Sequence, residues 1–246
     1  MYDDIQEKIA LIIPCFNEEK RLHLDKFNLF HQNVYFLFVD DGSVDNTAKL
    51  ITENLPSNSF FIKLNRNRGK AEAVRQGVFY LKNMSLYEEL SWIGYWDADL
   101  STPLEAIFEL LIFRTFYSGE IYGVFGSRIC KLGSEITRLY IRHLLGRLVA
   151  TFAALLLRVK SYDSQCGAKL FRKEIIGLAF DHPFISIWLF DLEIILRLNN
   201  YRIVECPLKK WQHVKGSKLN FFKDTHRVLI DLFRIRNEYV KNINGF

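Results

Sequence analysis

Five short apolar segments recur through the first half of the chain, and each is followed by polar residues and then by a segment with helical periodicity. The segments cover residues 9–13, 34–39, 60–64, 92–96 and 121–125. Continuous apolar runs of this length are typical of strands that are buried on both faces of a sheet. Because strands and helices alternate, we expect an α/β fold with a mostly parallel sheet, right-handed crossovers and flanking helices.

Polar side chains stand at the carboxyl end of each of these segments. They are Asn17, the pair Asp40 and Asp41, the pair Arg68 and Lys70, the pair Asp97 and Asp99, and Arg128. In an open α/β sheet, the loops at the carboxyl ends of the strands border the crevice where ligands bind. We therefore expect these side chains to converge on one ligand site.

The pair Asp97 and Asp99 is a candidate metal site. It ends the apolar run 92–96, and Pro103 then opens the next helical segment. Aspartates two positions apart can share one hard cation such as Mg²⁺ or Mn²⁺, which keeps open positions for phosphate oxygens. A solvated, aspartate-rich turn after a strand would give the same tripeptide, so the pair alone does not establish a metal site.

Length and motif content favour one domain of unusual nucleotide-binding type. Neither Gly-x-Gly-x-x-Gly nor a Walker-type loop occurs, so a classical dinucleotide site and a P-loop are not supported. We find no linker rich in Pro, Gly or Ser and no internal repeat, and we expect a single domain over residues 1–246. The four cysteines lie far apart without a Cys-x-x-Cys spacing, which favours a reducing compartment over a disulfide framework or a zinc site.

The net charge of +5 is unevenly distributed. Residues 1–127 carry 12 basic and 18 acidic side chains, whereas residues 128–160 carry 7 and 1, and residues 205–246 carry 9 and 4. The basic segments are interleaved with Phe, Leu, Ile and Trp, which favours an anionic membrane surface or a phosphate-bearing lipid as partner. Nucleic acid is not expected, because a phosphate backbone has no use for long aliphatic runs.

A membrane-spanning helix is not expected. The longest uncharged apolar run, residues 148–157, has ten residues, and a spanning helix takes roughly 20. Asp3, Asp4 and Glu7 precede the first apolar run, which is the wrong charge for an export signal. We therefore expect peripheral association with the cytoplasmic face of a membrane.

The second half of the chain predicts helices with a basic and an apolar face. We expect one or two helices over 134–158, a helix over 188–198, a strand over 203–208 and a last amphipathic helix over 221–239. Asp191 lies in the helix over 188–198, in a hydrophobic context. It is a helix cap, an exposed charge or a catalytic base.

Several ordered motifs together resemble family-2 glycosyltransferases with the GT-A fold, and the resemblance covers nearly the whole chain. Motifs shared widely in that family are Ile13-Pro-Cys-Phe-Asn-Glu-Glu19, Val39-Asp-Asp-Gly-Ser-Val-Asp45, Asn67-Arg-Gly-Lys70, Asp97-Ala-Asp-Leu100 and Gly126-Ser-Arg128. Three others are similar to the branch of dolichyl-phosphate glucosyltransferases and polyprenyl-phosphate sugar transferases. These are Asp163-Ser-Gln-Cys-Gly-Ala-Lys-Leu-Phe171, Trp188-Leu-Phe-Asp-Leu-Glu193 and Gly216-Ser-Lys-Leu219.

The resemblance implies a donor-binding half over 1–128. The donor-binding residues would be Pro14, Asn17 and Glu18 around the nucleotide, Asp41 on the base, and Arg68 and Lys70 nearby. Asp97 and Asp99 would hold a divalent cation, Mg²⁺ or Mn²⁺, on the donor diphosphate. Ser101 stands where some relatives place a Gln, which leaves a third protein ligand open.

The resemblance also implies an acceptor-binding, membrane-facing half over 129–246, with Arg128 at its border. The acceptor-binding residues would be Arg128, Arg142, Gln165 and Lys218, and the catalytic candidates are Asp99, Arg128, Arg142 and Asp191. A phosphate monoester is already ionised near neutral pH, so it needs arginines to orient it rather than a strong base.

The implied activity is an inverting, metal-dependent sugar transfer, with glucose from UDP-glucose as the donor and a polyprenyl or dolichyl phosphate as the acceptor. Two alternatives stay open. A family-2 transferase acting on a hydroxyl of a glycan or protein would need Asp191 as base. A non-catalytic nucleotide-binding membrane module would bind nucleotide without turnover.

Overall fold

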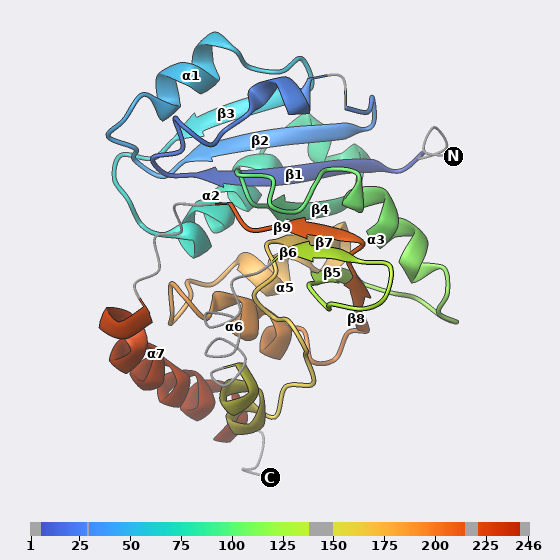
Figure 1. Ribbon diagram of the computed structural model, residues 1–246, viewed down its shortest axis with the longest axis vertical. Coiled ribbons are helices and arrows are strands. Elements are labelled where there is room, and N and C mark those ends of the chain that lie inside the picture. Colours follow the sequence, from blue (N-terminus) through green and yellow to red (C-terminus); the bar gives the residue numbers. More distant parts are fainter. Residues whose placement is uncertain (1–5, 29, 138–149, 215–220, 242–246) are drawn as a thin grey trace.

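A seven-stranded sheet forms the centre of the computed structural model, which describes residues 6–28, 30–137, 150–214 and 221–241. The strand order is β3-β2-β1-β4-β7-β5-β8 (Figure 1). The strands are β1 (Lys8–Cys15), β2 (Val34–Asp40), β3 (Ser59–Lys63), β4 (Leu90–Trp96), β5 (Gly123–Ser127), β7 (Ala168–Arg172) and β8 (Ile203–Pro207). Only β7 is antiparallel to its neighbours in this sheet, so the expected α/β fold with a mostly parallel sheet is confirmed.

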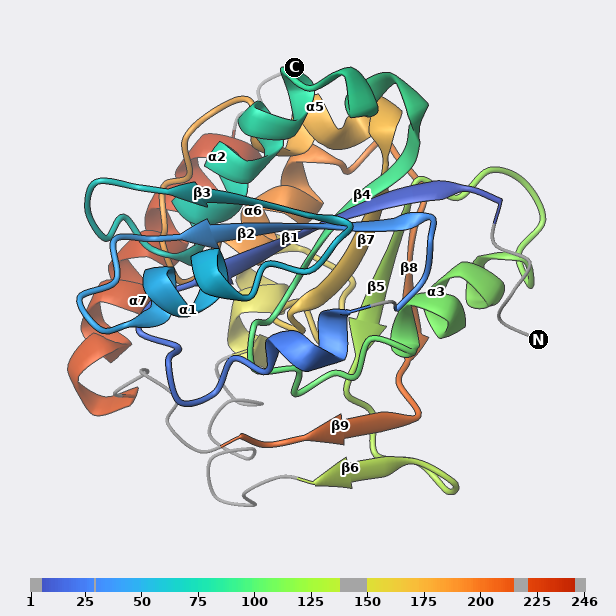
Figure 2. The ribbon, with the colours of Figure 1, turned by 90° about the horizontal axis from the view of Figure 1, so that it is seen from above.

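Helices cover both faces of the sheet (Figure 2). One face packs against η1 (Leu24–Phe27), α1 (Thr47–Glu53) and α3 (Ala106–Arg114). The other packs against α2 (Lys70–Lys82), α5 (Ile176–Phe180) and α6 (Phe190–Arg197), with the short turns η2 (Ser85–Glu89) and η3 (Lys173–Ile175) beside them.

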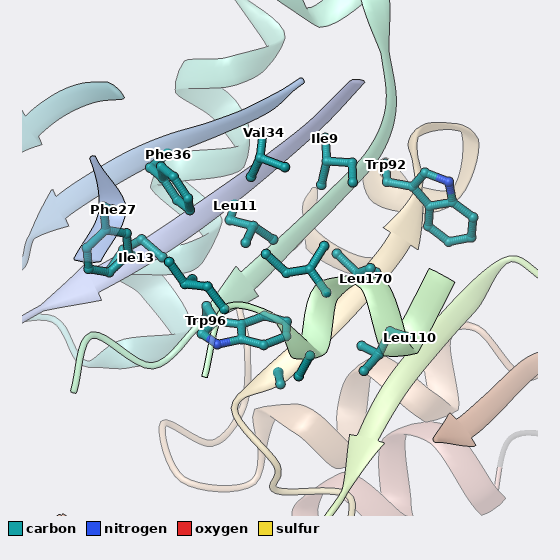
Figure 3. Packing of buried hydrophobic residues seen from close by; sticks show 14 of the residues in the cluster. Ile9, Leu11, Ile13, Phe27, Val34, Phe36, Trp92, Trp96, Leu110 and Leu170 are labelled. Atoms are coloured by element: carbon teal, nitrogen blue, oxygen red, sulfur yellow. The ribbon is translucent and has the colours of Figure 1, made fainter. Parts of the chain in front are cut away.

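The apolar run of β1 explains this three-layer arrangement. Ile9, Leu11 and Ile13 point to one face, while Ala10 and Ile12 point to the other, and all five are buried. Figure 3 shows the first of these two cores, in which side chains from β1, β2, β4 and α3 pack together. Fully burying one such aliphatic side chain stabilises the fold by roughly 1.5–3 kcal/mol, so the strand ends that carry the site are held rigidly.

A two-stranded parallel sheet lies beside the main one and consists of β6 (Glu135–Thr137) and β9 (Lys210–Gln212) (Figure 2). The Gln212 N–H donates to the carbonyl of Ser101 at 2.9 Å, which ties β9 to the loop after β4. The expected helix over 134–158 is therefore wrong at its start, because these residues pair with β9 instead. Residues 138–149 lie outside the described residues, and residues 150–157 are helical.

A third hydrophobic cluster joins the helix over 150–157 to α7 (Phe221–Ile235) and to the π-helical turn Arg236–Lys241. Leu157, Leu192 and Leu232 are among its buried members. Within the described part of the chain, no helix is long and apolar enough to cross a membrane.

Asn17 is a residue type that caps helices, and the acidic Glu18 and Glu19 follow it, so the sequence predicts a helix from there towards His31; this prediction is wrong. Among the described residues between β1 and β2, only η1 is helical, and Asn17 has a positive φ of 50°. Asn17 uses its hydrogen bonds across the fold: its N–H donates to Ser43 Oγ, and its Oδ1 accepts the N–H of Val44, each at 2.9 Å. A side chain engaged in this way does not cap a helix of its own segment.

Candidate functional site

Asp97 follows β4 directly and forms an ion pair with the first residue of α2. The Lys70 Nζ lies 2.6 Å from the Oδ1 of Asp97. Burial raises the pKa of the Asp97 carboxyl, but the ammonium of Lys70, with smaller effects of Arg128 and Lys169, outweighs it and holds the pKa below its ordinary value. Asp97 is therefore a carboxylate at neutral pH.

Asp99 lies in a different electrostatic environment. Burial, and next the charge of Asp97, raise the pKa of its carboxyl above the ordinary value, although hydrogen bonds from Ser101 oppose this. The Ser101 N–H donates to the Oδ1 of Asp99 at 3.0 Å, and the Nη1 of Arg21 lies 3.8 Å from its Oδ2. The carboxylates of Asp97 and Asp99 repel each other, and a divalent cation bound between them would offset that repulsion.

Gly167 leaves room for the Asp97 carboxylate. A Cβ at position 167 would lie 1.9 Å from the Oδ2 of Asp97, which is far inside any contact distance. The Asp97 N–H also donates to the carbonyl of Gly167 at 3.1 Å. The loop before β7 therefore forms a wall against which Asp97 lies.

The donor set at this point fits a hard cation. Asp97 and Asp99 supply carboxylate oxygens, the ligands that Mg²⁺ and Mn²⁺ prefer. Among the described residues there is no cluster of three or more His, Cys, Asp or Glu that could hold a metal. A hard cation that is held by one or two carboxylates usually completes its coordination with water and phosphate oxygens. Ser101 hydrogen-bonds to Asp99, which is a role distinct from that of a third metal ligand.

Asp41 organises the loop between β3 and α2. Its Oδ1 accepts the N–H of Arg68 at 2.8 Å, and its Oδ2 accepts the N–H of Gly69 at 2.7 Å. Burial raises the pKa of the Asp41 carboxyl to about 6, although both N–H bonds lower it. Asp41 therefore holds the strand-to-helix turn that leads into Lys70.

A pocket of about 330 Å³ lies beside this turn. It is lined by Lys63, Leu64, Asn65, Arg66, Arg68 and Gln76. The same turn leads into Lys70, whose ammonium bonds to Asp97.

The loop after β1 is joined to Asp99 through Arg21. The Nη2 of Arg21 donates to the Oε1 of Glu18, and its Nη1 faces Asp99. The Glu18 N–H donates to Thr47 Oγ1 at 2.7 Å. Pro14 lies near the end of β1, past the last residue that pairs with β4, so its missing N–H costs no hydrogen bond there.

Arg128 follows β5 and is held by Asp163. Its Nε and Nη2 donate to the two carboxylate oxygens of Asp163 at 2.7 and 2.6 Å, and its N–H donates to Oδ2 at 2.9 Å. Burial lowers the pKa of Arg128, but Asp163 outweighs it and raises the pKa above the ordinary value. The guanidinium also lies 5.3 Å from the ring centroid of Trp211. These contacts fix its orientation at the edge of the site.

Asp191 is neither an exposed charge nor a simple helix cap. It is buried at the start of α6, where its Oδ1 accepts from the hydroxyl of Tyr95 and from the Nζ of Lys169, the latter at 2.5 Å. Lys169 is fully buried on β7 and also donates to the carbonyl of Cys166 at 2.5 Å. Of the roles that the sequence left open for Asp191, an exposed charge is therefore excluded, because the residue is one half of a buried ion pair.

The remaining predicted acceptor residues are only partly described. Gln165 is exposed and donates from Nε2 to the carbonyl of Trp188 at 3.3 Å. Arg142 and Lys218 lie outside the described residues.

Sequence reasoning missed several residues that shape the site: Arg21, Asp163, Gly167, Lys169 and Glu205. Two of them carried a usable signal. Lys169 stands inside an apolar strand segment, and Asp163 opens the motif that ends at Phe171. The roles of Arg21, Gly167 and Glu205 depend on contacts with segments distant in sequence, so the sequence alone does not indicate them.

Comparison with known families gives a match over more than half of the chain. A model described as "Glycosyl transferase family 2" matches residues 10–176, which include the ends of β1, β2, β4 and β5 and the loop before β7.

Two curated relatives are similar over almost the whole chain. The dolichyl-phosphate beta-glucosyltransferase of Dictyostelium discoideum is 29% identical over 255 residues, which covers 96% of this chain and 76% of that protein. The dolichyl-phosphate beta-glucosyltransferase of Saccharomyces cerevisiae is 30% identical over 263 residues, which covers 98% of this chain and 78% of that protein.

Among solved structures, the fold is similar to that of glucosyl-3-phosphoglycerate synthase from Mycobacterium tuberculosis in complex with Mn²⁺ and UDP-glucose. The TM-score is 0.68 at 16% identity, and the match covers 94% of this chain and 79% of the other. At that identity, the likeness concerns the fold alone.

Proposed function

The chain belongs to glycosyl transferase family 2 and is therefore a glycosyltransferase with the GT-A fold, and we propose that it transfers glucose from UDP-glucose to a polyprenyl phosphate such as dolichyl phosphate. The transfer inverts the configuration at the anomeric carbon. Relatives named as dolichyl-phosphate beta-glucosyltransferases, similar over nearly the full chain, support the sugar and the acceptor. A solved neighbour that holds UDP-glucose and Mn²⁺ supports the donor.

One observation carries the choice of acceptor. Asp191 forms a buried ion pair with Lys169 and accepts a hydrogen bond from Tyr95. Burial, and next the charge of Asp191, raise the pKa of the Tyr95 hydroxyl well above its ordinary value, so this hydroxyl stays protonated and keeps donating. A carboxylate held by two donors is poorly placed to remove a proton from a hydroxyl acceptor. A phosphate acceptor is already ionised and does not need that base.

The donor side uses the residues that surround the strand ends β1, β2 and β4. Asp41 holds the turn at Arg68 and Gly69, and the nucleotide lies against this turn and the loop with Asn17 and Glu18. Pro14 lines the same nucleotide-binding surface, at the end of β1. Lys70, at the amino end of α2, lies where a diphosphate would gain from both its charge and the helix terminus.

Asp97 and Asp99 would hold the divalent cation, Mg²⁺ or Mn²⁺. A bound cation supplies stabilisation of the negative charge that builds on the departing diphosphate. The residues of the chain then keep that geometry: Lys70 and Gly167 fix Asp97, while Ser101 and Arg21 fix Asp99.

On the acceptor side, Arg128 orients the phosphate monoester beside the anomeric carbon. Its guanidinium is locked by Asp163, so the entropy of ordering it is already lost before the acceptor binds. We propose that Arg142, Gln165 and Lys218 also bind the acceptor, as the resemblance implies.

The acceptor's lipid tail requires a membrane surface, and α7 is suited to one. Leu229, Ile230 and Phe233 are 40%, 53% and 50% exposed on its outer face, and the basic residues Arg227 and Arg234 flank them. Exposed apolar side chains beside cationic ones are typical of a helix that lies in the interface of an anionic membrane.

We further propose that residues 1–246 act as a single catalytic domain, since β7 and β8 of the second half complete the sheet of the first. The first half binds the nucleotide sugar, and the second binds the acceptor and faces the membrane. The protein then works peripherally, on the cytoplasmic face.

A transfer assay with radiolabelled sugars tests this function. A panel of nucleotide sugars is offered to a short polyprenyl phosphate and, in parallel, to the polyprenol without phosphate. We expect label in the organic phase from UDP-glucose with the phosphate only, lost with a chelator and in Asp97→Asn and Asp99→Asn. Transfer to polyprenol, and not to the phosphate, would replace this proposal with a hydroxyl-acceptor enzyme. Bound nucleotide without any transfer would indicate a non-catalytic module.

A further inference from the structure

Arg128 owes its orientation to a short segment that precedes β7. Both oxygens of Asp163 are used on Arg128: the Nε and Nη2 donate to Oδ2 and Oδ1, and the backbone N–H of Arg128 donates to Oδ2. Such a two-oxygen fork sets the plane of the guanidinium as well as its position. The orientation of Arg128 therefore depends on where the backbone places Asp163.

The backbone at Asp163 is itself held by Glu205. The Oε1 of Glu205 accepts the hydroxyl of Ser161 at 2.6 Å and the N–H of Asp163 at 2.9 Å. Its Oε2 accepts the N–H of Tyr162 at 2.9 Å. One carboxylate thus satisfies three donors on three consecutive residues.

Glu205 has a rigid base from which to do this. It lies on β8, which pairs in parallel with β5, and its partner across the ladder is Phe125. Arg128 follows the end of the same strand β5. Glu205 and Arg128 are therefore both anchored on the paired strands β8 and β5, and Asp163 connects them through hydrogen bonds.

We propose that Glu205 is a positioning residue for acceptor binding, which acts through Asp163 to set the orientation of Arg128. This inference rests on the proposed function, because it takes Arg128 to bind the acceptor phosphate. A purely structural glutamate would alter the free energy of unfolding and leave the balance between donor and acceptor affinity unchanged.

The substitution Glu205→Gln tests this with little change in shape. Glutamine keeps one accepting oxygen, but its amide nitrogen would face one of the backbone N–H groups, donor against donor. Calorimetric titration of the full chain measures the affinity for a short-chain, water-soluble polyprenyl phosphate and, separately, for UDP with Mn²⁺. We expect the acceptor dissociation constant to rise about tenfold and the UDP dissociation constant to stay within about twofold.

Glu7→Gln is the matched control. Glu7 accepts from Arg114 and from the Nε1 of Trp92, at the opposite end of the strands. The loss of its carboxylate should leave both affinities unchanged. Ser161→Ala removes one of the three bonds to Glu205 and should raise the acceptor dissociation constant by about two- to threefold, so it decides the matter if Glu205→Gln fails to fold.

Three results would overturn the proposal. Equal loss of both affinities in Glu205→Gln would make Glu205 a general structural residue. Unchanged acceptor affinity in Glu205→Gln, or in Ser161→Ala where the first variant does not fold, would remove the path to Arg128. A wild-type protein that binds UDP but no polyprenyl phosphate would refute the proposed function, and the inference with it.

Discussion

The replacement Gly167→Ala should damage the proposed metal site without removing any charged group. The added Cβ would lie 1.9 Å from the Oδ2 of Asp97, and real Cβ atoms essentially never approach a heavy atom closer than 3.0 Å. The carboxylate or the loop must then move by more than about 1 Å. Because the Oδ1 of Asp97 is bonded to Lys70, rotation of the carboxylate would also break that ion pair.

The cost can be worked from this displacement. Metal–ligand distances tolerate only about 0.2 Å, so a shift of this size should lower the affinity for Mn²⁺ by roughly 10- to 100-fold. A misplacement of about 1 Å at a reacting centre costs on the order of 10² in rate, or about 2.7 kcal/mol in the activation free energy. Electron paramagnetic resonance titration of Mn²⁺ measures the first effect, and single-turnover transfer of sugar measures the second.

Gly133→Ala is the control for introducing a methyl group at a glycine. Gly133 has a φ of 84° and no atom within 4 Å of an added Cβ, so the substitution should cost about 1 kcal/mol of stability and leave the affinity for Mn²⁺ unchanged. If Gly167→Ala binds Mn²⁺ and turns over within twofold of the wild type, Asp97 does not hold the cation in the way argued above.

Three further predictions concern pH, the buried ion pair and the membrane. The pKa of Asp41 is about 6 in the folded chain and ordinarily 3.8, so the folded state binds its proton more tightly. Its contribution to the free energy of unfolding should fall by at most about 3 kcal/mol as the pH rises from about 4 to 6, a slope that urea unfolding should not find in Asp41→Asn. Lys169→Met leaves Asp191 buried without its cation and should lower the free energy of unfolding by about 3–5 kcal/mol. Lys169→Met combined with Asp191→Asn should recover part of this loss. If urea unfolding gave the single and the double variant the same stability, the two residues would not be coupled. Ile230→Ser with Phe233→Ser should weaken sedimentation with anionic liposomes and leave UDP binding unchanged, and full retention on liposomes would exclude this face of α7 as the membrane contact.

The fold could be predicted from the sequence because its strands carry an unambiguous pattern. The runs that became β1, β2 and β4 are apolar on both faces, which only a sheet covered on both sides accommodates. The expected GT-A fold is confirmed. The antiparallel insertion of β7 between β4 and β5 could not be predicted, because it depends on pairings that local sequence does not encode.

Two helical segments were predicted wrongly, the one after Asn17 and the start of the one over 134–158. In both, tertiary hydrogen bonds replace those of a local helix. Asn17 has the residue type of a helix cap, but Ser43 and Val44, 26 and 27 positions away, engage it instead. Residues 135–137 lie in a basic, helix-like segment, yet they pair with β9. In both places, a contact distant in sequence outweighs a local preference.

Site residues could be predicted where the residue type alone determines the chemistry. They could not be predicted where the role depends on a partner side chain from another element. Asp97 and Asp99 were identified by their position after a strand. The burial of Asp191 against Lys169 could not be foreseen, because the two residues lie 22 positions apart on different elements. The same holds for Glu205, which lies 42 positions from Asp163. Whether Asp41 and Arg128 contact donor and acceptor stays a prediction.

The linkage in the product tests the proposed transfer most directly. The wild-type protein is incubated with UDP-glucose, Mn²⁺ and a short polyprenyl phosphate, and the purified lipid product is examined by phosphorus and proton NMR. We expect a phosphodiester between the polyprenyl chain and glucose, with the β configuration at the anomeric carbon. A glucose attached to a hydroxyl, an α-configured phosphodiester, or no glucosylated lipid from an otherwise active enzyme would contradict the proposed reaction.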